Sequence, residues 1–522
     1  EIAKSLGAKV YNIQWDDDFS AARNESIKHA TSDWIMWMDA DDRIDDLNTQ
    51  KLLYAKKNFP KDKKEAYYLL IHDEQNDKDK ESMWFQLRIF PRREDVFFEG
   101  RIHEQVIFSL ERVGIPSKFL DVKIKHTGYA DHSILFRKAY RNLRMLFRED
   151  EERPNQFWVK NYIGITLKMI GRYDEAVDYI KEALSIVPET SDFWKGNVSL
   201  NLASTYAELG NFVEAEKVLK EAVERNKNDG CLRLFYADAL LSLGKYEQAL
   251  EHINFVKDNG VNVAIVPISV RTLSQKMWYV DGMINFHLGN YREALVSLEK
   301  IKDKFGDNKF KQIYAETLLR LGMYREAESC YEKIENKSTV DLINLGIVKE
   351  SLGKYDEAEE LYRQVIVSDL KNKDALLNLG QLLFRRHKYD ESKVIFLKFA
   401  DEFETMEKED YPYLKSALIC LANILLREDD FPTVLEVMNA ILSVSGMAKH
   451  INDTADMAES WCDIAETMEG IFIKTIALEN AVVCLRIPGI ETEPARTEAA
   501  LKRIQSIMTD VQNSMRAGGF MH

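Results

Sequence analysis

Two aspartates follow directly after a short, continuous run of apolar residues. Residues 34–38 read Trp-Ile-Met-Trp-Met, and Asp39 and Asp41 follow in the segment Asp39-Ala40-Asp41-Asp42. Such a run predicts a buried strand, and ligands of open α/β sheets bind beyond the carboxyl ends of the strands. Two carboxylates there suit Mg²⁺ or Mn²⁺, which complete their coordination with phosphate oxygens of a substrate. The alternative is a solvated turn whose acids cap a helix beginning near Leu47.

Cationic, amide and imidazole side chains flank these acids in the sequence. Arg23 and Asn24 stand at the start of an expected helix, before the acidic segment. Among the polar groups after it are His103, Glu104 and His126. For His103 and Glu104 the alternative interpretation is a hydrogen-bonded loop pair, and for His126 it is a strand-end histidine with satisfied hydrogen bonds.

Apolar runs alternate with helical patterns in residues 1–126. We expect strands at residues 9–13, 34–38, 66–71 and 85–90, and helices at residues 19–30 and 48–58. This alternation predicts an α/β layer with a largely parallel sheet. The tryptophans in this part, Trp15, Trp34, Trp37 and Trp84, are interpreted as core, although one near the acids could stack on a base or a sugar. An amphipathic helix at residues 132–149 connects this layer to the C-terminal part of the chain.

The rest of the chain is dominated by an internal repeat. The sequence motif Gly-x-aromatic-x-x-Ala, here called the repeated phrase, begins at Gly171, Gly210, Gly244, Gly289, Gly322 and Gly353. Degenerate copies follow around His387 and Asp429. The intervals centre on about 34 residues, the period of the tetratricopeptide repeat. Gly171 permits a turn, and small residues at Gly164 and Ala176 let two antiparallel helices approach closely. About eight such pairs, stacked into a right-handed solenoid, are expected over residues 155–444.

Composition excludes several classes of protein. The chain has 522 residues, 45% of them hydrophobic, and a net charge of −15. Global disorder is excluded, and the acidic balance argues against a general nucleic-acid binder. The five cysteines are widely spaced, without a CxxC pair, which predicts reduced thiols in a cytoplasmic protein. No apolar run approaches the roughly 20 residues that span a bilayer.

Taken jointly, the ordered segments resemble family 2 glycosyltransferases of the GT-A fold. The segments are Asp18 to Glu25, Asp39 to Asp42, Arg88 to Arg92, Phe98 to Glu104 and His126 to Tyr129. The resemblance is greatest to the bacterial subgroup that carries a tetratricopeptide array behind the transferase domain. The resemblance in sequence extends over residues 1 to about 190. For the rest of the chain it is a resemblance in domain architecture only.

The resemblance implies roles for individual residues. Asp39 and Asp41 match the family's Asp-x-Asp motif, which contacts the ribose of a nucleotide sugar and holds Mg²⁺ or Mn²⁺ on its diphosphate. Arg23 and Asn24 match the stretch beside the donor, and Asp42 is expected to support the ligands. His126 matches the late histidine that completes the metal shell in many GT-A enzymes.

The acceptor side is represented by one short segment. Glu104 stands where such enzymes place the general base that deprotonates the acceptor, and its neighbour His103 is the rival for that role. The family's first strand and its Asp-x-Gly-Ser-x-Asp loop have no counterpart in this sequence. We therefore expect an α/β domain that is truncated at its N-terminus.

These implications combine into one functional prediction. A GT-A-like domain (1–130), a connecting helix (131–154), a repeat array (155–444) and a helical cap and tail (445–522) would form an inverting, metal-dependent glycosyltransferase. It would transfer a sugar from a nucleotide-sugar donor to a protein or peptide acceptor, held on the concave face of the repeats. The asparagines expected to point there are Asn161, Asn201, Asn285, Asn344 and Asn378.

Two alternatives and one open question accompany this prediction. The protein could instead be a non-catalytic tetratricopeptide scaffold, or a transferase that acts on a glycan or a lipid carrier. A solenoid can also form homo-oligomers without a readable sequence signal.

Overall fold

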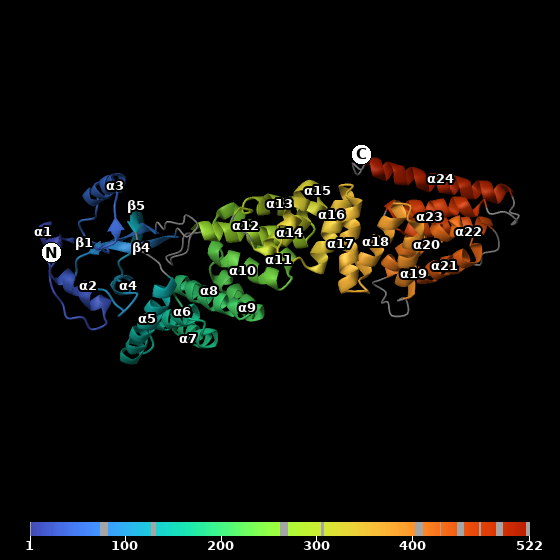
Figure 1. Ribbon diagram of the computed structural model, residues 1–522. Coiled ribbons are helices and arrows are strands. Elements are labelled where there is room, and N and C mark those ends of the chain that lie inside the picture. The colour runs from blue at the N-terminus through green and yellow to red at the C-terminus, as the bar shows by residue number, and fades with distance from the viewer. Residues whose placement is uncertain are drawn as a thin grey trace. The chain divides into compact units, whose positions relative to one another are not determined.

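A computed structural model describes residues 2–73, 82–126, 132–261, 270–303, 307–401, 411–428, 430–445, 454–468, 471–486 and 494–517. The chain divides into two compact units, Glu1–Phe305 and Gly306–His522. The first unit contains all described strands and helices α1–α13, and the second contains α14–α24 (Figure 1). The domain boundaries near residues 130, 154 and 444 stay a prediction. None of the described helices combines the length and apolar character that crossing a bilayer requires.

The strands of the first unit form one mixed sheet. They are β1 (Trp34–Met36), β2 (Asp42–Arg43), β3 (Ala66–Asp73), β4 (Ser82–Pro91) and β5 (Ser117–His126), in the order β1-β4-β3-β5-β2. Only the β3–β5 pairing is parallel among these described strands. The expected largely parallel sheet is therefore wrong here. Residues 74–81 are too few for the parallel crossover of a dozen or more residues, so β3 and β4 pair antiparallel.

Five helices belong to this α/β part. They are α1 (Ile2–Ser5), α2 (Phe19–Lys28), α3 (Asp46–Lys57), α4 (Ile107–Arg112) and α5 (His132–Glu152). The helices expected at residues 19–30, 48–58 and 132–149 and three of the four expected strands are confirmed to within a few residues. Helix α4 and strands β2 and β5 were not among the expected elements. The strand expected at residues 9–13 is absent from the described chain. Val10, Tyr11 and Ile13 are exposed there, and no described strand pairs with them.

The two faces of the sheet are buried in different ways. One face, with Leu69 and Ile71 among its core residues, packs with Leu52 of α3. The other face carries Tyr68 and Leu87 in a cluster that includes residues of α4 and α5 and continues into the first helix pair of the repeats. The sheet and the first repeat therefore share one hydrophobic core.

Antiparallel helix pairs make up most of the remaining chain. In the first unit they are α6 (Phe157–Met169) with α7 (Tyr173–Ile186), α8 (Asp192–Glu208) with α9 (Phe212–Arg225), α10 (Gly230–Ser242) with α11 (Tyr246–Asn259), and α12 (Val270–His287) with α13 (Tyr291–Glu299). In the second unit they are α14 (Asn308–Arg320) with α15 (Tyr324–Glu332), α16 (Thr339–Ser351) with α17 (Tyr355–Ser368), α18 (Lys373–Arg385) with α19 (Tyr389–Asp401), and α20 (Tyr411–Arg427) with α21 (Phe431–Val444).

The repeated phrase has the structure that its residues predict. Its first position lies between the two helices of a pair and has a positive φ in all six glycine copies, for example +80° at Gly171. His387 takes the same place in the seventh copy with φ +58°. The last position of the phrase is buried throughout, from Ala176 to Ala358. Glycine is favoured at the turn because it adopts positive φ without a steric penalty.

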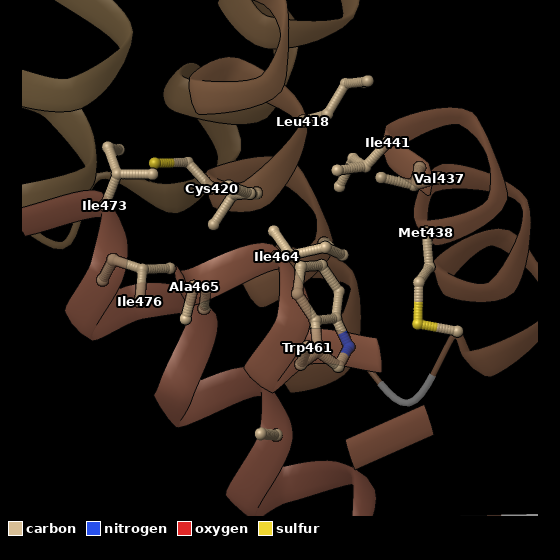
Figure 2. Close-up of a cluster of buried hydrophobic side chains, with 14 of the residues drawn as sticks. Leu418, Cys420, Val437, Met438, Ile441, Trp461, Ile464, Ala465, Ile473 and Ile476 are labelled. Atoms are coloured by element: carbon tan, nitrogen blue, oxygen red, sulfur yellow. The ribbon is translucent and has the colours of Figure 1, made fainter. Parts of the chain in front are cut away.

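The second unit ends in a large apolar cluster. Helices α22 (Thr454–Thr467), α23 (Ile471–Cys484) and α24 (Pro494–Ala517) contribute to it together with α20 and α21. Figure 2 shows Trp461 of α22 inside this cluster, which also contains Met438 and Cys420. Trp461 is fully buried. These helices bury the apolar surface that the last repeat would otherwise expose.

Close helix approach within a pair gives a direct test of the repeat packing. A Cβ added at Gly164 would lie 2.3 Å from Cγ1 of Ile180 on the facing helix. We therefore expect Gly164→Ala to lower the free energy of unfolding by about 1–3 kcal/mol, despite the better helix propensity of alanine. Urea unfolding followed by tryptophan fluorescence measures this change.

The matched control is Gly196→Ala in the neighbouring helix α8. There the new Cβ would meet Nδ2 of Asn226 and Cδ1 of Leu232, each at 3.2 Å, and both are ends of side chains that can shift by a few tenths of an ångström. We expect this variant to stay within about 1 kcal/mol of the parent. Equal effects of the two substitutions would contradict the close approach of α6 and α7.

Candidate functional site

A buried arginine lies at the centre of the polar site on the α/β part. The Arg88 side chain on β4 is only 1% exposed, and its guanidinium lies 3.7 Å from the ring centroid of Trp37. Its Nη1 is 2.9 Å from Oδ2 of Asp42, and its Nη2 is 3.4 Å from Oδ2 of Asp39. Burial lowers the pKa of Arg88, while Asp42 and Asp39 act in the opposite direction. The cation holds both aspartates at the end of the sheet.

Asp41, Asp42 and His126 form a compact group of potential metal ligands. One ligand atom from each lies within 4.8 Å of the others. His126 ends β5 and is paired in register with Asp42 of β2, so its Nδ1 lies 3.0 Å from Oδ1 of Asp42. Its Nε2 is 3.6 Å from Oδ2 of Asp41. Two carboxylates and an imidazole fit a divalent cation, and the nitrogen ligand suits Mn²⁺ better than Mg²⁺.

Asp39 lies outside this group, although its place in the Asp-x-Asp motif predicts a metal ligand. Its carboxylate is engaged by Arg88 and by Arg23, whose Nη2 is 3.0 Å from Oδ1 of Asp39. Asp42, expected in a supporting place, takes the position beside His126 instead. The reason is the turn after β1, in which the backbone N–H of Asp39 donates to Oδ2 of Asp42 at 2.7 Å.

Arg23 connects the acidic turn to the segment that carries Glu104. Its Nε donates to Oε1 of Glu104 at 2.5 Å, while its guanidinium lies 4.0 Å from the ring centroid of Trp37. One side chain on α2 therefore contacts a carboxylate from each of two distant segments. Trp37 lies against both Arg23 and Arg88, and its indole N–H donates to the carbonyl of Leu87 at 2.9 Å.

The Asn24 side chain, expected beside the donor, hydrogen-bonds to backbone groups of the protein instead. Its Nδ2 donates to the carbonyl of Phe98 at 2.9 Å, and its Oδ1 accepts from the N–H of Phe98 at 2.8 Å. This paired contact fixes α2 to the segment that precedes the Glu104 loop. In the structure Asn24 therefore supports the loop.

The loop that carries His103 and Glu104 is closed at its base and held from outside. The backbones of Glu99 and Gln105 exchange two hydrogen bonds of 2.9 Å. Gly100 has φ +105°, and a Cβ there would lie 3.1 Å from the Trp158 ring on α6. Helix α6, the first of the repeats, therefore packs directly on the loop.

Helix α5 holds the same loop through charged side chains, of which Arg101 and Glu149 are buried. The Arg101 guanidinium binds Glu152 with contacts of 2.6 to 2.9 Å, and the Arg101 backbone N–H donates to the carboxylate of Glu149. Burial raises the pKa of Glu149, while these hydrogen-bonding and cationic partners act to lower it. The loop conformation thus depends on both α5 and the first repeat.

His103 and Glu104 face different surroundings despite being neighbours. His103 has φ +56° and stacks on Tyr162 of α6, with ring centroids 4.4 Å apart. Although part of His103 remains exposed, crowding by protein atoms lowers its pKa from 6.5 to about 4. The ring is neutral at pH 7 and a weaker base than an ordinary histidine. Glu104, only 11% exposed, is paired with Arg23 instead.

Comparison with known proteins matches parts of the chain to two families. The sequence model described as "Glycosyl transferase family 2" matches residues 1–100, and three described as "Tetratricopeptide repeat" match residues 155–228, 207–258 and 343–392. The chain carries a family 2 glycosyltransferase domain followed by tetratricopeptide repeats. The α/β sheet and the helix pairs are the folds expected from the sequence.

Individual relatives resemble parts of the chain. Glycosyltransferase SunS of Bacillus phage SPbeta, also present as a prophage-derived protein in Bacillus subtilis, is 27% identical over 191 residues. That match covers 34% of this chain and 42% of the relative, so the chain spans less than half of its length. A repeat protein of Synechococcus elongatus is 36% identical over 109 residues, covering 21% of this chain and 26% of that protein. A solved tetratricopeptide repeat protein from Parabacteroides merdae shares 16% identity, covers 48% of this chain and 98% of its own, and has a TM-score of 0.31.

Several residues of the glycosyltransferase domain's site were not singled out from the sequence. The sequence indicates Arg88 only as a member of the segment Arg88 to Arg92, and it predicts Trp37 in the core. The signal for Arg88 was available, because a cation inside the apolar strand segment 85–90 must be paired when buried. Tyr162 and Trp158 belong to the repeats, and no sequence pattern indicates that they contact the loop.

The buried charge of Arg88 leads to a stability prediction. Replacing Arg88 with methionine removes the main cationic partner of Asp42, whose side chain is fully buried. We expect Arg88→Met to lower the free energy of unfolding by about 3–5 kcal/mol, because a buried charge then lacks its partner. The exposed Arg92→Met, which loses a hydrogen bond to the carbonyl of Ser32, should change it by less than about 1 kcal/mol. Urea unfolding of both variants measures these changes. A small loss of stability in Arg88→Met would show that Asp42 has sufficient hydrogen-bonding partners without Arg88.

Proposed function

We propose that the protein is an inverting, metal-dependent glycosyltransferase that moves a sugar from a nucleotide-sugar donor to a protein or peptide acceptor. The family 2 match supports the transfer chemistry, and the repeats, which commonly form extended binding surfaces, support a protein acceptor. The observation that carries the proposal is the single polar network. It runs from His126 and Asp42 through Arg88, Asp39 and Arg23 to Glu104.

The acidic end of this network is suited to bind the metal-bound diphosphate of a nucleotide-sugar donor. Asp41, Asp42 and His126 would hold Mn²⁺ or Mg²⁺. A bound divalent cation supplies charge neutralisation for the diphosphate leaving group. Asp39 is positioned by two arginines, so its carboxylate orientation is set before a ligand arrives. Such preorganisation avoids rearranging charges at the moment of reaction.

Glu104 is the better candidate for the general base. Its carboxylate is held by Arg23 and would accept the proton of the acceptor's nucleophilic group as that group bonds to the anomeric carbon. The bond from the anomeric carbon to the diphosphate oxygen breaks on the opposite side, which inverts the configuration. His103 is less suited, because its ring is stacked on Tyr162 of α6 and none of its described contacts is with Arg23 or the acidic turn.

The setting of the reaction is part of the proposal. We place the protein in the cytoplasm, where its five free cysteines, four of them buried, would stay reduced. Homo-oligomerisation through the repeats stays a prediction from the sequence. A non-catalytic scaffold and a transferase for glycan or lipid carriers are the competing functions, which metal binding and transfer kinetics separate.

Metal binding tests the donor side. We expect the protein to bind Mn²⁺ and Asp41→Asn to weaken this affinity by more than about tenfold, since one of three ligands is lost. The Asp41 side chain is 44% exposed, so the substitution should leave the fold intact, which circular dichroism verifies. Isothermal titration with MnCl₂ measures the affinity. Asp62→Asn, at an exposed aspartate away from the cluster, is the control, and unchanged binding in Asp41→Asn would contradict the assigned site.

Transfer kinetics test the acceptor side. In a screen of common nucleotide sugars for release of nucleoside diphosphate, we expect Glu104→Gln to reduce the rate by about 100-fold or more, with unchanged Mn²⁺ affinity. Exposed Glu94→Gln is the matched control. Complete absence of turnover with every donor would favour the scaffold instead, and full activity of Glu104→Gln would return the base role to His103.

A further inference from the structure

A pocket of about 450 Å³ opens between the sheet of the glycosyltransferase domain and the first two repeats. We name it the seam pocket; its lining includes Phe85 and Leu87 of β4, Phe157 and Tyr162 of α6, and Trp194 of α8. All of these residues belong to the first compact unit. The volume lies in the range of specific small-ligand sites.

The seam pocket is aromatic and nearly uncharged. Among the described residues that line it, Lys138 is the only one with a formal charge at neutral pH. Its aromatic walls are preorganised: Phe108 stacks on Trp158 at 5.2 Å, and Phe157 lies 5.5 Å from Trp194. A phosphate-bearing ligand would need more cations than one lysine, so the lining disfavours a nucleotide or a phospholipid carrier. It favours an apolar or aromatic group.

Side-chain amides lie on the repeat side of the seam pocket. Asn201 donates through Nδ2 to Oδ1 of Asn161 at 3.2 Å and lies 3.5 Å from Oδ1 of Asn197. In the described contacts Asn161 and Asn197 use only their oxygens, which leaves their Nδ2 groups as donors for a ligand. A carboxamide offers both a donor and an acceptor, as a peptide group requires. Asn161 and Asn285, both expected on the concave face, are both buried, but Asn285 differs in that its Nδ2 donates to Asp281.

The pocket continues along the repeats as a second hollow. This hollow, of about 330 Å³, shares Ile165, Met169 and Asn201 with the seam pocket and extends to Glu208 on α8. A groove of this form fits an extended chain better than a compact ligand. Its charged groups, Lys168 and Glu208, lie beyond the aromatic part.

The seam pocket adjoins both halves of the catalytic network. His103 and Gln105, which flank Glu104, line it, and the Glu104 charge acts on Tyr162 in its wall. Trp84, which also lines it, packs edge-to-face on His126 with centroids 6.4 Å apart. A ligand in the pocket therefore lies next to the candidate base and near the candidate metal ligands.

We propose that the seam pocket is the acceptor subsite: it binds an extended polypeptide segment by enclosing an aromatic side chain and by hydrogen-bonding the adjacent peptide groups through Asn161 and Asn197. This inference rests on the proposed function and names the acceptor class and the residues that select it. The aromatic anchor would set which neighbouring residue of the acceptor reaches Glu104.

Two lining residues allow a test without damage to the core. Phe193 is 44% and Met169 is 55% exposed, so their replacement should not affect folding. The probes are the capped pentapeptides Gly-Ser-Phe-Ser-Gly and Gly-Ser-Ala-Ser-Gly, with maltopentaose as the glycan. We expect the phenylalanine peptide to bind about tenfold more tightly than the alanine peptide, because burial of the ring contributes roughly the free energy of one decade in affinity. Quenching of Trp158 and Trp194 fluorescence reports binding.

Variants then locate the binding. Phe193→Ala and Met169→Glu should each weaken the phenylalanine peptide by about fivefold or more, whereas Val213→Ala should have no effect. Val213 is 63% exposed on α9 and does not line the seam pocket. Equal binding of the two peptides, no binding, preference for maltopentaose, or unchanged affinity in Phe193→Ala would each overturn the proposal. The assay contains neither donor nor cation, so its result is independent of whether Mn²⁺ binding and sugar transfer succeed.

Discussion

Burial of the Arg88 guanidinium is the constraint on which the site depends. A cation that is 1% exposed must have anionic partners, because an unpaired charge in the protein interior costs several kcal/mol. Those partners are Asp42 and Asp39, and the pairing defines the turn after β1. Asp42 in turn contacts His126, while Asp39 contacts Arg23 and thereby Glu104. One buried charge therefore orders the carboxylates at both ends of the network.

The first repeat supports the candidate site directly and is not only an appended module. Its core is continuous with one face of the sheet, Trp158 lies against Gly100, and Tyr162 lies against His103. Glycine is required at position 100 by its φ of +105° and by the close approach of the indole. Because the same helix α6 lines the seam pocket, the loop that carries Glu104 and the proposed acceptor subsite are held by one element. The position of the Glu104 loop and the shape of the seam pocket therefore both depend on the packing of α6.

Much of the fold was predictable because its signals are local. The turn glycines and the buried alanines recur with the repeat period, and an apolar run followed by acids marked β1 and its turn correctly. Strand pairing was not predictable in the same way. The sheet was expected to be largely parallel because strands and helices alternate. Three of its four described pairings, β1–β4, β3–β4 and β2–β5, are instead antiparallel, and only β3–β5 is parallel. Residues 9–13 have strand composition without a described strand beside them, and composition alone cannot supply a hydrogen-bonding partner.

The sequence by itself determined the repeat architecture, the acidic turn and the list of polar residues from which the site is built, since residue type and spacing along the chain carry that information. The tertiary structure decided how those residues are used. It grouped Asp42 with Asp41 and His126 and gave Asp39 to two arginines, because Asp42 is paired with His126 across β2 and β5. In the tertiary structure Asn24 also hydrogen-bonds the backbone of Phe98, and the repeat residues Trp158 and Tyr162 pack against the Glu104 loop. These contacts join segments far apart in the chain. Strand pairing and the docking of α2 bring the first of them together, and the packing of the first repeat on the α/β part brings the others.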